Sequence, residues 1–287
     1  MTSLVFPFQH RLRVRWSEVD AQRVVFNGHY LNYLDTAISD YWRAVGLPYP
    51  EGLAHLGGDV FVRRNVLEYH APARLDDWLD IGLRCERIGR SSITVLWEMR
   101  SGGRLLVSGE TVYVFIGLST GRPATVPDSL RLQLDRQAQG LPVHELRCGD
   151  WTSLAPMARA VRTAVFIEEQ GIAQADEWDE DDAQALHAVV TNLAGLPLAT
   201  GRLITAGLPP GDAKIGRMAV LRSSRGVGLG EQVLQALIDA ARAKGIAHLS
   251  LHAQTSAQAF YQRAGFSPQG EVFDEVGIPH VTMALRL

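Results

Sequence analysis

The feature that most constrains the fold is a change of apolar periodicity within the first half of the chain. Across Tyr30–Val45, apolar residues recur three, four and seven positions apart, the spacing of one buried helix face. Gly46 and Pro48 predict the end of this helix, because glycine tolerates the left-handed conformation and proline cannot continue a helix. From Val60 the period becomes two, which predicts one long helix followed by an antiparallel meander. Its turns are expected at 89–91 and 101–103.

The second half alternates strand-like and helical segments, and a weakly patterned stretch separates it from the first. A chain of 287 residues exceeds the usual size of one domain. We therefore expect an α+β protein with an N-terminal domain at 1–137, a linker at 138–143 and a C-terminal α/β domain with a mixed central sheet at 144–287. Strands of the C-terminal domain are expected at about 186–193, 198–206, 214–221, 247–253 and 281–285, with helices at 154–165, 229–244 and 257–264.

Composition excludes several classes of protein. Two cysteines, Cys85 and Cys148, cannot form a disulfide framework or a cysteine metal site, and we expect no metal. Residues 1–137 hold 16 basic and 15 acidic side chains and the remainder 12 and 16, so neither half has the basic excess of a nucleic-acid binder. No apolar stretch is long enough to span a membrane and no secretory signal is evident, so we expect a cytoplasmic protein.

One segment before the first helix carries a recognisable motif. Residues 14–35 read VRWSEVDAQRVVFNGHYLNYLD. This segment resembles the signature of the 4-hydroxybenzoyl-CoA thioesterase family of hotdog folds, and the resemblance extends over residues 10 to about 137. It implies a long helix wrapped by an antiparallel sheet, hydrolysis of an acyl-CoA thioester, and Asp20 at the catalytic carboxylate position. Gln22 and Arg23 stand where many relatives carry a small residue and glycine.

The chemistry of this segment is reasonable on physical grounds. Free backbone N–H groups around Asn27 and Gly28, at the positive end of the helix, can polarise a thioester carbonyl. A nearby carboxylate can activate water or attack the carbonyl itself. The alternative is that Asp20 only caps a turn. Three weaker candidates are His29 as a catalytic participant and Arg63 and Arg64 as contacts to CoA phosphates.

A glycine-rich loop in the second half predicts a phosphate site. Residues 225–230 read RGVGLG between an expected strand and an expected helix, so backbone N–H groups and the helix dipole can hold a pyrophosphate. The spacing fits neither the Rossmann fingerprint nor a P-loop. With GRMAV at 216–220 before the loop and AFYQRAGF at 259–266 after it, residues 143–287 resemble the GNAT acyltransferase superfamily. The flanking motifs VFIEEQG at 165–171 and GIPH at 277–280 extend the resemblance.

The GNAT resemblance implies acetyl-CoA as the acyl donor. Its pyrophosphate would lie on Arg225, Gly226, Val227, Gly228, Leu229 and Gly230, and its pantetheine amides on Met218, Ala219 and Val220. Tyr261 matches the tyrosine that protonates the departing thiolate, a role suited to a phenol because its ordinary pKa of ~10 exceeds the ~8.5 of a thiol. The alternative for Tyr261 is an aromatic side chain packed on a helix face.

The general base for an acceptor amine is less well defined by the sequence. The candidates are Glu168, Glu169, His187, Glu271 and Glu275. Acidic residues crowd positions 176–182, where they could attract a cationic acceptor, but we interpret the run as a solvated loop because charge runs usually are.

The sequence therefore predicts a bifunctional acyl-CoA enzyme, a thioesterase followed by an N-acetyltransferase. Coenzyme A derivatives and an unidentified amine are the expected partners, and the hotdog half is expected to make a homo-oligomer because a lone sheet leaves an open edge. In the alternative, one half has lost catalysis and serves as an oligomerising or acyl-CoA-sensing module.

Overall fold

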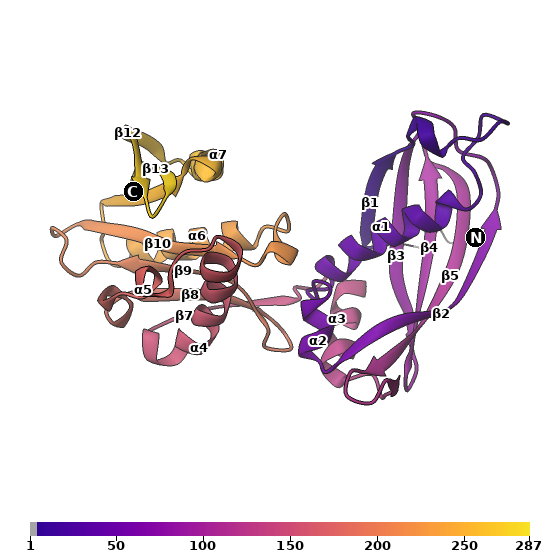
Figure 1. Cartoon of the computed structure of the whole chain (residues 1–287), viewed down its shortest axis with the longest axis horizontal. Helices are drawn as coiled ribbons and strands as arrows, with labels where there is room; N and C mark the ends of the chain where they lie inside the picture. The colour runs from indigo at the N-terminus through magenta and orange to yellow at the C-terminus, as the bar shows by residue number, and fades with distance from the viewer. Residues whose placement is uncertain (1–4) are drawn as a thin grey trace. The chain divides into compact units, whose positions relative to one another are not determined.

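The predicted first helix is α1, His29–Ala44, in a computed structural model that describes residues 5–287 (Figure 1). The face expected to be buried is buried, with Tyr30, Leu34 and Tyr41 each at most 4% exposed. Gly46 takes φ +79° just beyond the last turn, the left-handed conformation expected there. Apolar periodicity and the terminating glycine together account for both the position and the end of this helix.

An antiparallel sheet packs against α1. Its strands are β1 Phe8–Arg13, β2 Gly58–Tyr69, β3 Trp78–Ile88, β4 Ser92–Ser101, β5 Arg104–Gly117 and the short β6 Arg122–Pro123. The spatial order is β1-β3-β4-β5-β2, with β6 on β5, and every pairing is antiparallel. The meander β3-β4-β5 and its two turns agree with the predicted pattern, whereas β1 was not predicted. Helices α2 Glu51–His55 and α3 Asp128–Ala138 complete this half.

The C-terminal half is built on a seven-stranded mixed sheet in the order β12-β13-β11-β10-β9-β8-β7. Only β10 and β11 are parallel among the pairs with an assigned register. Helices α4 and α6 pack on β8, β9 and β10. The strands are β7 His144–Gly149, β8 Leu186–Asn192, β9 Pro197–Ile204, β10 Asp212–Val220, β11 His248–Gln254, β12 Ser267–Glu275 and β13 Ile278–Arg286. The helices are α4 Trp151–Arg162, α5 Gln174–Glu177, α6 Leu229–Ala243 and α7 Gln258–Arg263.

Strand β12 was missed by the sequence analysis. Its residues are mostly exposed and lack the alternation of a half-buried strand, so pairing with β13 rather than an apolar pattern defines it. The described chain separates into two compact units, one ending at His144 and the other Glu145–Leu287. Within residues 5–287, no helix is long and apolar enough to span a membrane.

Candidate functional sites

A short hairpin holds Asp20 in the N-terminal unit. The Asp20 N–H donates to the Val24 carbonyl at 2.9 Å, and Val19 and Val25 form an antiparallel bridge. Oδ1 of Asp20 accepts a hydrogen bond from the Gln22 N–H at 2.8 Å, and no hydrogen bond within the described chain uses Oδ2. Arg23 has φ +61°, so the residue that departs from the family pattern forms the left-handed turn itself. Asp20 thus stabilises the turn with one oxygen and leaves the other available.

A buried glutamate that the sequence analysis did not single out ties this hairpin to α1. Glu18 is 4% exposed and accepts 2.7 Å hydrogen bonds from the Tyr33 hydroxyl and from the backbone and side chain of Arg15. Burial raises the pKa of Glu18, but these bonds outweigh it and the net pKa is lowered. The signal available in the sequence was Tyr33, because a hydroxyl on a buried helix face needs a partner.

The start of α1 presents backbone donors beside this hairpin. Among residues 5–287, the N–H groups of Asn27 and Gly28 have no backbone acceptor, whereas the His29 N–H donates to the Phe26 carbonyl. The Asn27 carbonyl accepts a hydrogen bond from the Tyr69 hydroxyl at 3.2 Å, which fixes the local chain. Free donors at a helix start are the arrangement that can polarise a carbonyl oxygen.

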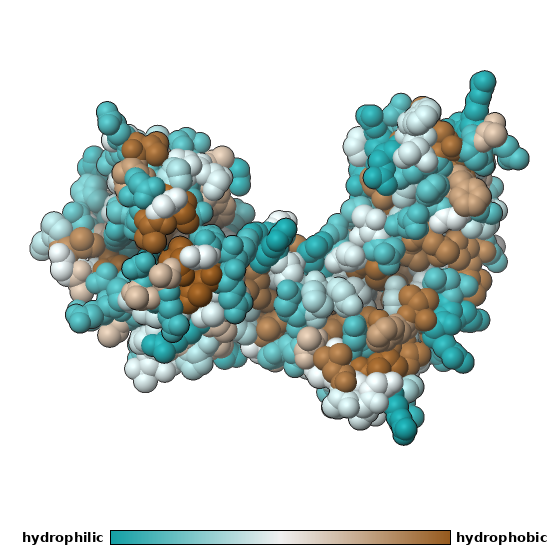
Figure 2. All heavy atoms as spheres, viewed as in Figure 1, coloured by the Kyte–Doolittle hydropathy of each residue, from teal (hydrophilic) through white to brown (hydrophobic). Residues whose placement is uncertain are grey.

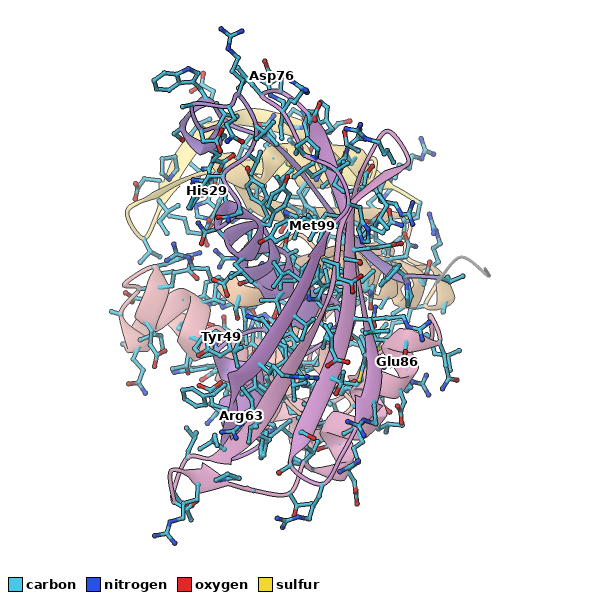
Figure 3. The ribbon with its side chains drawn as sticks, turned by 90° about the vertical axis from the view of Figure 1, so that its right-hand side faces the viewer. His29, Tyr49, Arg63, Asp76, Glu86 and Met99 are labelled. Carbon is cyan, nitrogen blue, oxygen red and sulfur yellow. The ribbon has the colours of Figure 1, made fainter. Side chains whose placement is uncertain are left out.

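The three weaker candidates are less well placed. His29 lies at the first turn of α1, and its Nδ1 is 3.2 Å from the side-chain nitrogen of Asn32. Arg64 forms an ion pair with Glu110 of the neighbouring strand. The hydroxyl of Tyr69, at the end of β2, contacts Asn27 beside the Asp20 hairpin. Arg63 lies six residues before Tyr69 on the same strand, which separates their backbones by about 20 Å. In Figure 3, His29 lies in the upper part of this unit and Arg63 in its lower part. One copy of the chain does not bring these arginines to Asp20.

Strand β2 leaves the N-terminal sheet with an open edge. It is the last strand in the sheet order, and most of its residues are exposed. Figure 2 shows hydrophobic residues gathering on the surface of this unit. The exposed apolar side chains of β2 are Phe61, Val62, Val66 and Tyr69, between 40% and 57% exposed. An unpaired apolar edge is a surface on which a second chain can pair.

In the C-terminal unit, two parallel strands separate and open a cavity. β10 pairs with β11 only over Asp212–Ile215. Beyond that point β10 carries a bulge against β9, where Arg217 takes φ +52°. Ala219 and Val220 pair again with β9 on their other side, and no register joins them to β11. A cavity of ≈ 340 Å³ lies here and is lined by Met218 among others. The freed strand edge can pair with the amides of an extended ligand.

The predicted phosphate loop has the required backbone shape. Gly226 and Gly228 adopt φ +86° and +83°, a region that side chains disfavour, and α6 begins at Leu229. A second cavity of ≈ 330 Å³ lies over the loop, lined by Val220, Arg225, Gly226, Gly228, Leu229 and Gly230 among others. The N-terminus of a fifteen-residue helix opens into this cavity, which suits an anionic group.

Arg225 is engaged by the protein itself. Its guanidinium contacts both carboxylate oxygens of Glu169 at 2.7 Å and donates to the Val220 carbonyl at 3.1 Å. Its hydrogen bonds lower the pKa of Glu169. The arginine therefore shapes the loop, and Glu169 is committed to it rather than free to act as a base.

Tyr261 is a packed aromatic side chain that also lines the cavity. The side chain lies on α7, is 8% exposed and packs edge-on against Phe260 and Phe266. It also lines the cavity where β10 and β11 separate. Burial raises the pKa of Tyr261 to about 12, so the phenol stays protonated at neutral pH. A packed ring with a protonated hydroxyl at the cavity suits proton donation.

The acidic run 176–182 is solvated only in part, because four of its six acidic residues are exposed as predicted and two are buried. Glu177 and Asp182 are 2% and 3% exposed, and both contact the buried guanidinium of Arg162. Arg202 bonds to Asp179 and Asp182. The two buried carboxylates are tolerated in the interior because the guanidinium groups of Arg162 and Arg202 neutralise their charge. Arg162 and Arg202 were missed, because nothing local in the sequence says that they face the acidic run.

Among the predicted general bases, Glu275 alone lines the cavity of the described chain. His187 is 1% exposed, burial lowers its pKa, and its Nε2 lies 2.9 Å from the Asp182 carbonyl oxygen. Glu168, Glu169 and Glu271 lie outside the cavity lining. Glu275 contacts His252, a cavity residue that the sequence analysis did not name. No group of three or more potential ligands among residues 5–287 is arranged to hold a metal ion.

Comparisons with known proteins agree with this division. The model of the Thioesterase-like superfamily matches residues 14–134, and that of the Acetyltransferase (GNAT) domain matches residues 169–287. The chain therefore belongs to the thioesterase-like superfamily through its N-terminal half and to the GNAT acetyltransferases through its C-terminal half.

Individual relatives each resemble one half. The uncharacterized protein YyaT of Bacillus subtilis is 39% identical over 133 residues, which are 45% of this chain and 87% of that protein. A putative esterase of Aquifex aeolicus is 32% identical over 88 residues, 31% of this chain and 68% of the relative. The crystal structure of a putative N-acetyltransferase from Lactobacillus plantarum is 31% identical, with 51% of this chain and 99% of that chain covered and a TM-score of 0.47.

Proposed function

We propose that the chain is a bifunctional acyl-CoA enzyme. Its N-terminal half hydrolyses an acyl-CoA thioester, and its C-terminal half transfers the acetyl group of acetyl-CoA to an amine. The observation that carries the proposal is the cavity between β10 and β11, because it holds the protonated, buried Tyr261 and lies on the same strand that leads into the phosphate loop.

In the C-terminal half, the loop at 225–230 receives the pyrophosphate of acetyl-CoA through backbone N–H groups. The unpaired edge of Met218, Ala219 and Val220 pairs with the pantetheine amides, which directs the thioester toward Tyr261. An amine nitrogen then attacks the thioester carbonyl carbon. As the C–S bond breaks, the sulfur takes the proton of the Tyr261 hydroxyl.

In the N-terminal half, the N–H groups of Asn27 and Gly28 stabilise the negative charge that develops on the thioester oxygen. Asp20 uses its free oxygen either to activate water or to attack the carbonyl carbon. Glu18 holds the hairpin against α1, so it positions Asp20 without touching substrate.

Two copies complete the N-terminal site in this proposal. The exposed apolar edge of β2 pairs with a second chain, which would also bring the partner's surface toward the start of α1. Light scattering at micromolar concentration tests this part directly. A particle mass of 31.5 kDa, that of one chain, would contradict it.

A second candidate function follows from the hydrogen bond between Asp20 and Gln22. If that turn is the carboxylate's whole role, the N-terminal half is an oligomerising or acyl-CoA-sensing module that carries an active acetyltransferase. Incubation with a panel of acyl-CoA thioesters, following free thiol with and without amines, separates the possibilities. Amine-independent thiol release supports the thioesterase, and amine-dependent release supports the transferase.

A further inference from the structure

One face of the C-terminal sheet carries a histidine–glutamate pair that the proposed reaction does not yet use. In β11, Leu249, Leu251 and Ala253 are buried in the hydrophobic core to which α6 also contributes, so His252 points to the opposite face. It directly follows Leu251, the last residue of β11 paired with β10. His252 therefore stands where the two strands begin to separate, and it lines the same cavity as Tyr261.

The geometry around His252 fixes the role of each ring nitrogen. Nδ1 lies 2.8 Å from Oε2 of Glu275, and the imidazole packs edge-on against Phe273, with ring centroids 4.9 Å apart. Burial raises the pKa of Glu275, but the hydrogen bond and the neighbouring positive charges outweigh it and lower the net value. An ionised carboxylate accepts the Nδ1–H, and the lone pair of the neutral ring then resides on Nε2.

Charged groups surround Nε2 on the cavity side. Lys214 of β10 places Nζ 3.4 Å from Nε2, so an ammonium group already occupies the position from which a donor reaches this lone pair. Glu275 of β12 and His280 of β13 are further titratable neighbours, and the other charged residues that line the cavity are Asp176, Glu177, Asp179, Asp181, Arg202 and Arg217. An amine substrate that displaces this ammonium group presents its N–H to the same lone pair.

We propose that His252 is the general base of the acetyl transfer and that Glu275 positions it. The inference rests on the proposed acetyltransferase activity. As the amine nitrogen bonds to the thioester carbonyl carbon, the proton that it loses moves to Nε2 of His252. The C–S bond breaks, and the sulfur receives the proton of Tyr261. Glu275 stabilises the imidazolium through Nδ1–H, and solvent then returns the proton from His252 to the tyrosine.

The test compares His252→Gln with His248→Gln in the full-length protein. His248 lies on the same strand and has its own carboxylate partner, Asp212 at 3.2 Å, but it does not line the cavity. Acetyl-CoA is the donor, and spermidine, glucosamine and a peptide with a free amino terminus are the trial acceptors. We expect His252→Gln to lower kcat about a hundredfold and to remove the decline of kcat at acid pH, whereas His248→Gln keeps both.

Two further measurements separate chemistry from structure. The Kd for acetyl-CoA should stay within about twofold in His252→Gln, and added imidazole should restore part of the rate in His252→Ala. If the parent acetylates an amine but His252→Gln keeps the parent kcat and pH profile, the inference is overturned while the proposed function stands. An equal loss in His248→Gln also overturns it. If the parent acetylates none of the three acceptors, the proposed function is contradicted for these amines and the inference falls with it.

Discussion

The two halves differ in how completely one copy of the chain builds a site. In the C-terminal unit, strands and helices of a single chain enclose a cavity that contains Tyr261, and the phosphate loop follows on the same strand. In the N-terminal unit, Asp20 lies on a half-exposed hairpin, and the outer edge of strand β2 pairs with no other strand among residues 5–287. In both halves the motif specifies the local backbone shape. Only in the C-terminal unit of the described chain does a single copy also supply the residues that line a cavity at the motif.

The largest effect is expected for Asp20→Asn. Asparagine keeps the hydrogen bond to Gln22 but is neither a base nor a nucleophile, so thioester hydrolysis should fall by about 10²–10⁴-fold while acetyl transfer is unchanged. CoA release from several acyl-CoA thioesters measures the first rate and amine-dependent release the second. Asp76→Asn is the matched control, since Asp76 pairs with Arg13 on the surface of the same unit. Hydrolysis that persists in Asp20→Asn would remove the carboxylate from the mechanism.

Arg162→Met tests whether the C-terminal site depends on its buried charges. The substitution removes the buried guanidinium shared by Glu177 and Asp182, which then keep only Arg217 and Arg202 respectively, at a cost of up to about 3–5 kcal/mol of unfolding free energy. Hydrogen exchange resolved by peptide should show faster exchange in the C-terminal unit and unchanged exchange in the N-terminal unit. Arg242→Met, which removes an exposed pair with Asp239, should change stability by less than about 1 kcal/mol. Equal effects of the two variants would contradict the role given to burial.

A smaller loss is expected for Tyr261→Phe. The packed ring remains and only the hydroxyl is lost, so acetyl transfer should fall about 10- to 100-fold, while the Kd for acetyl-CoA stays within about twofold. Single-turnover kinetics under conditions in which chemistry limits the rate provide the measurement. Unchanged turnover would leave Tyr261 as a packing residue only.

The smallest effect concerns Glu18→Gln, which should destabilise the N-terminal unit by about 1–3 kcal/mol at neutral pH. Because folding lowers the pKa of Glu18, its contribution is full above the unfolded carboxyl value of about 4.3 and is lost as the pH falls through the folded value. The stability gap between parent and variant should therefore narrow below pH ~4. Urea unfolding at several pH values checks this, with the exposed Glu51→Gln as control. A gap independent of pH would exclude the ionised Glu18 as its source.

Much of the fold could be predicted because its signals are local. Apolar spacing placed α1, the meander β3-β4-β5 and helix α6, and Gly226 and Gly228 sit where the backbone takes a conformation that side chains disfavour. Strand β12 could not be predicted, because its existence depends on pairing with β13 rather than on its own pattern. Strand β1 was missed although Phe8, His10 and Leu12 alternate with exposed polar residues, a period of two over only six residues. The burial of Glu177 and Asp182 within the acidic run could not be predicted either, since their partner Arg162 lies on α4.

By itself, the sequence determined the two families, the order of the halves and the backbone of each motif, because periodicity and glycine placement act within a few residues. Which distant polar side chains come into contact depends on the tertiary structure. Glu18 accepts a hydrogen bond from Tyr33, fifteen positions away, and His252 contacts Glu275, twenty-three positions away. These contacts follow from strand register and helix packing, which are set by the burial of whole faces, so a residue's neighbours in sequence do not specify which distant side chain it will contact.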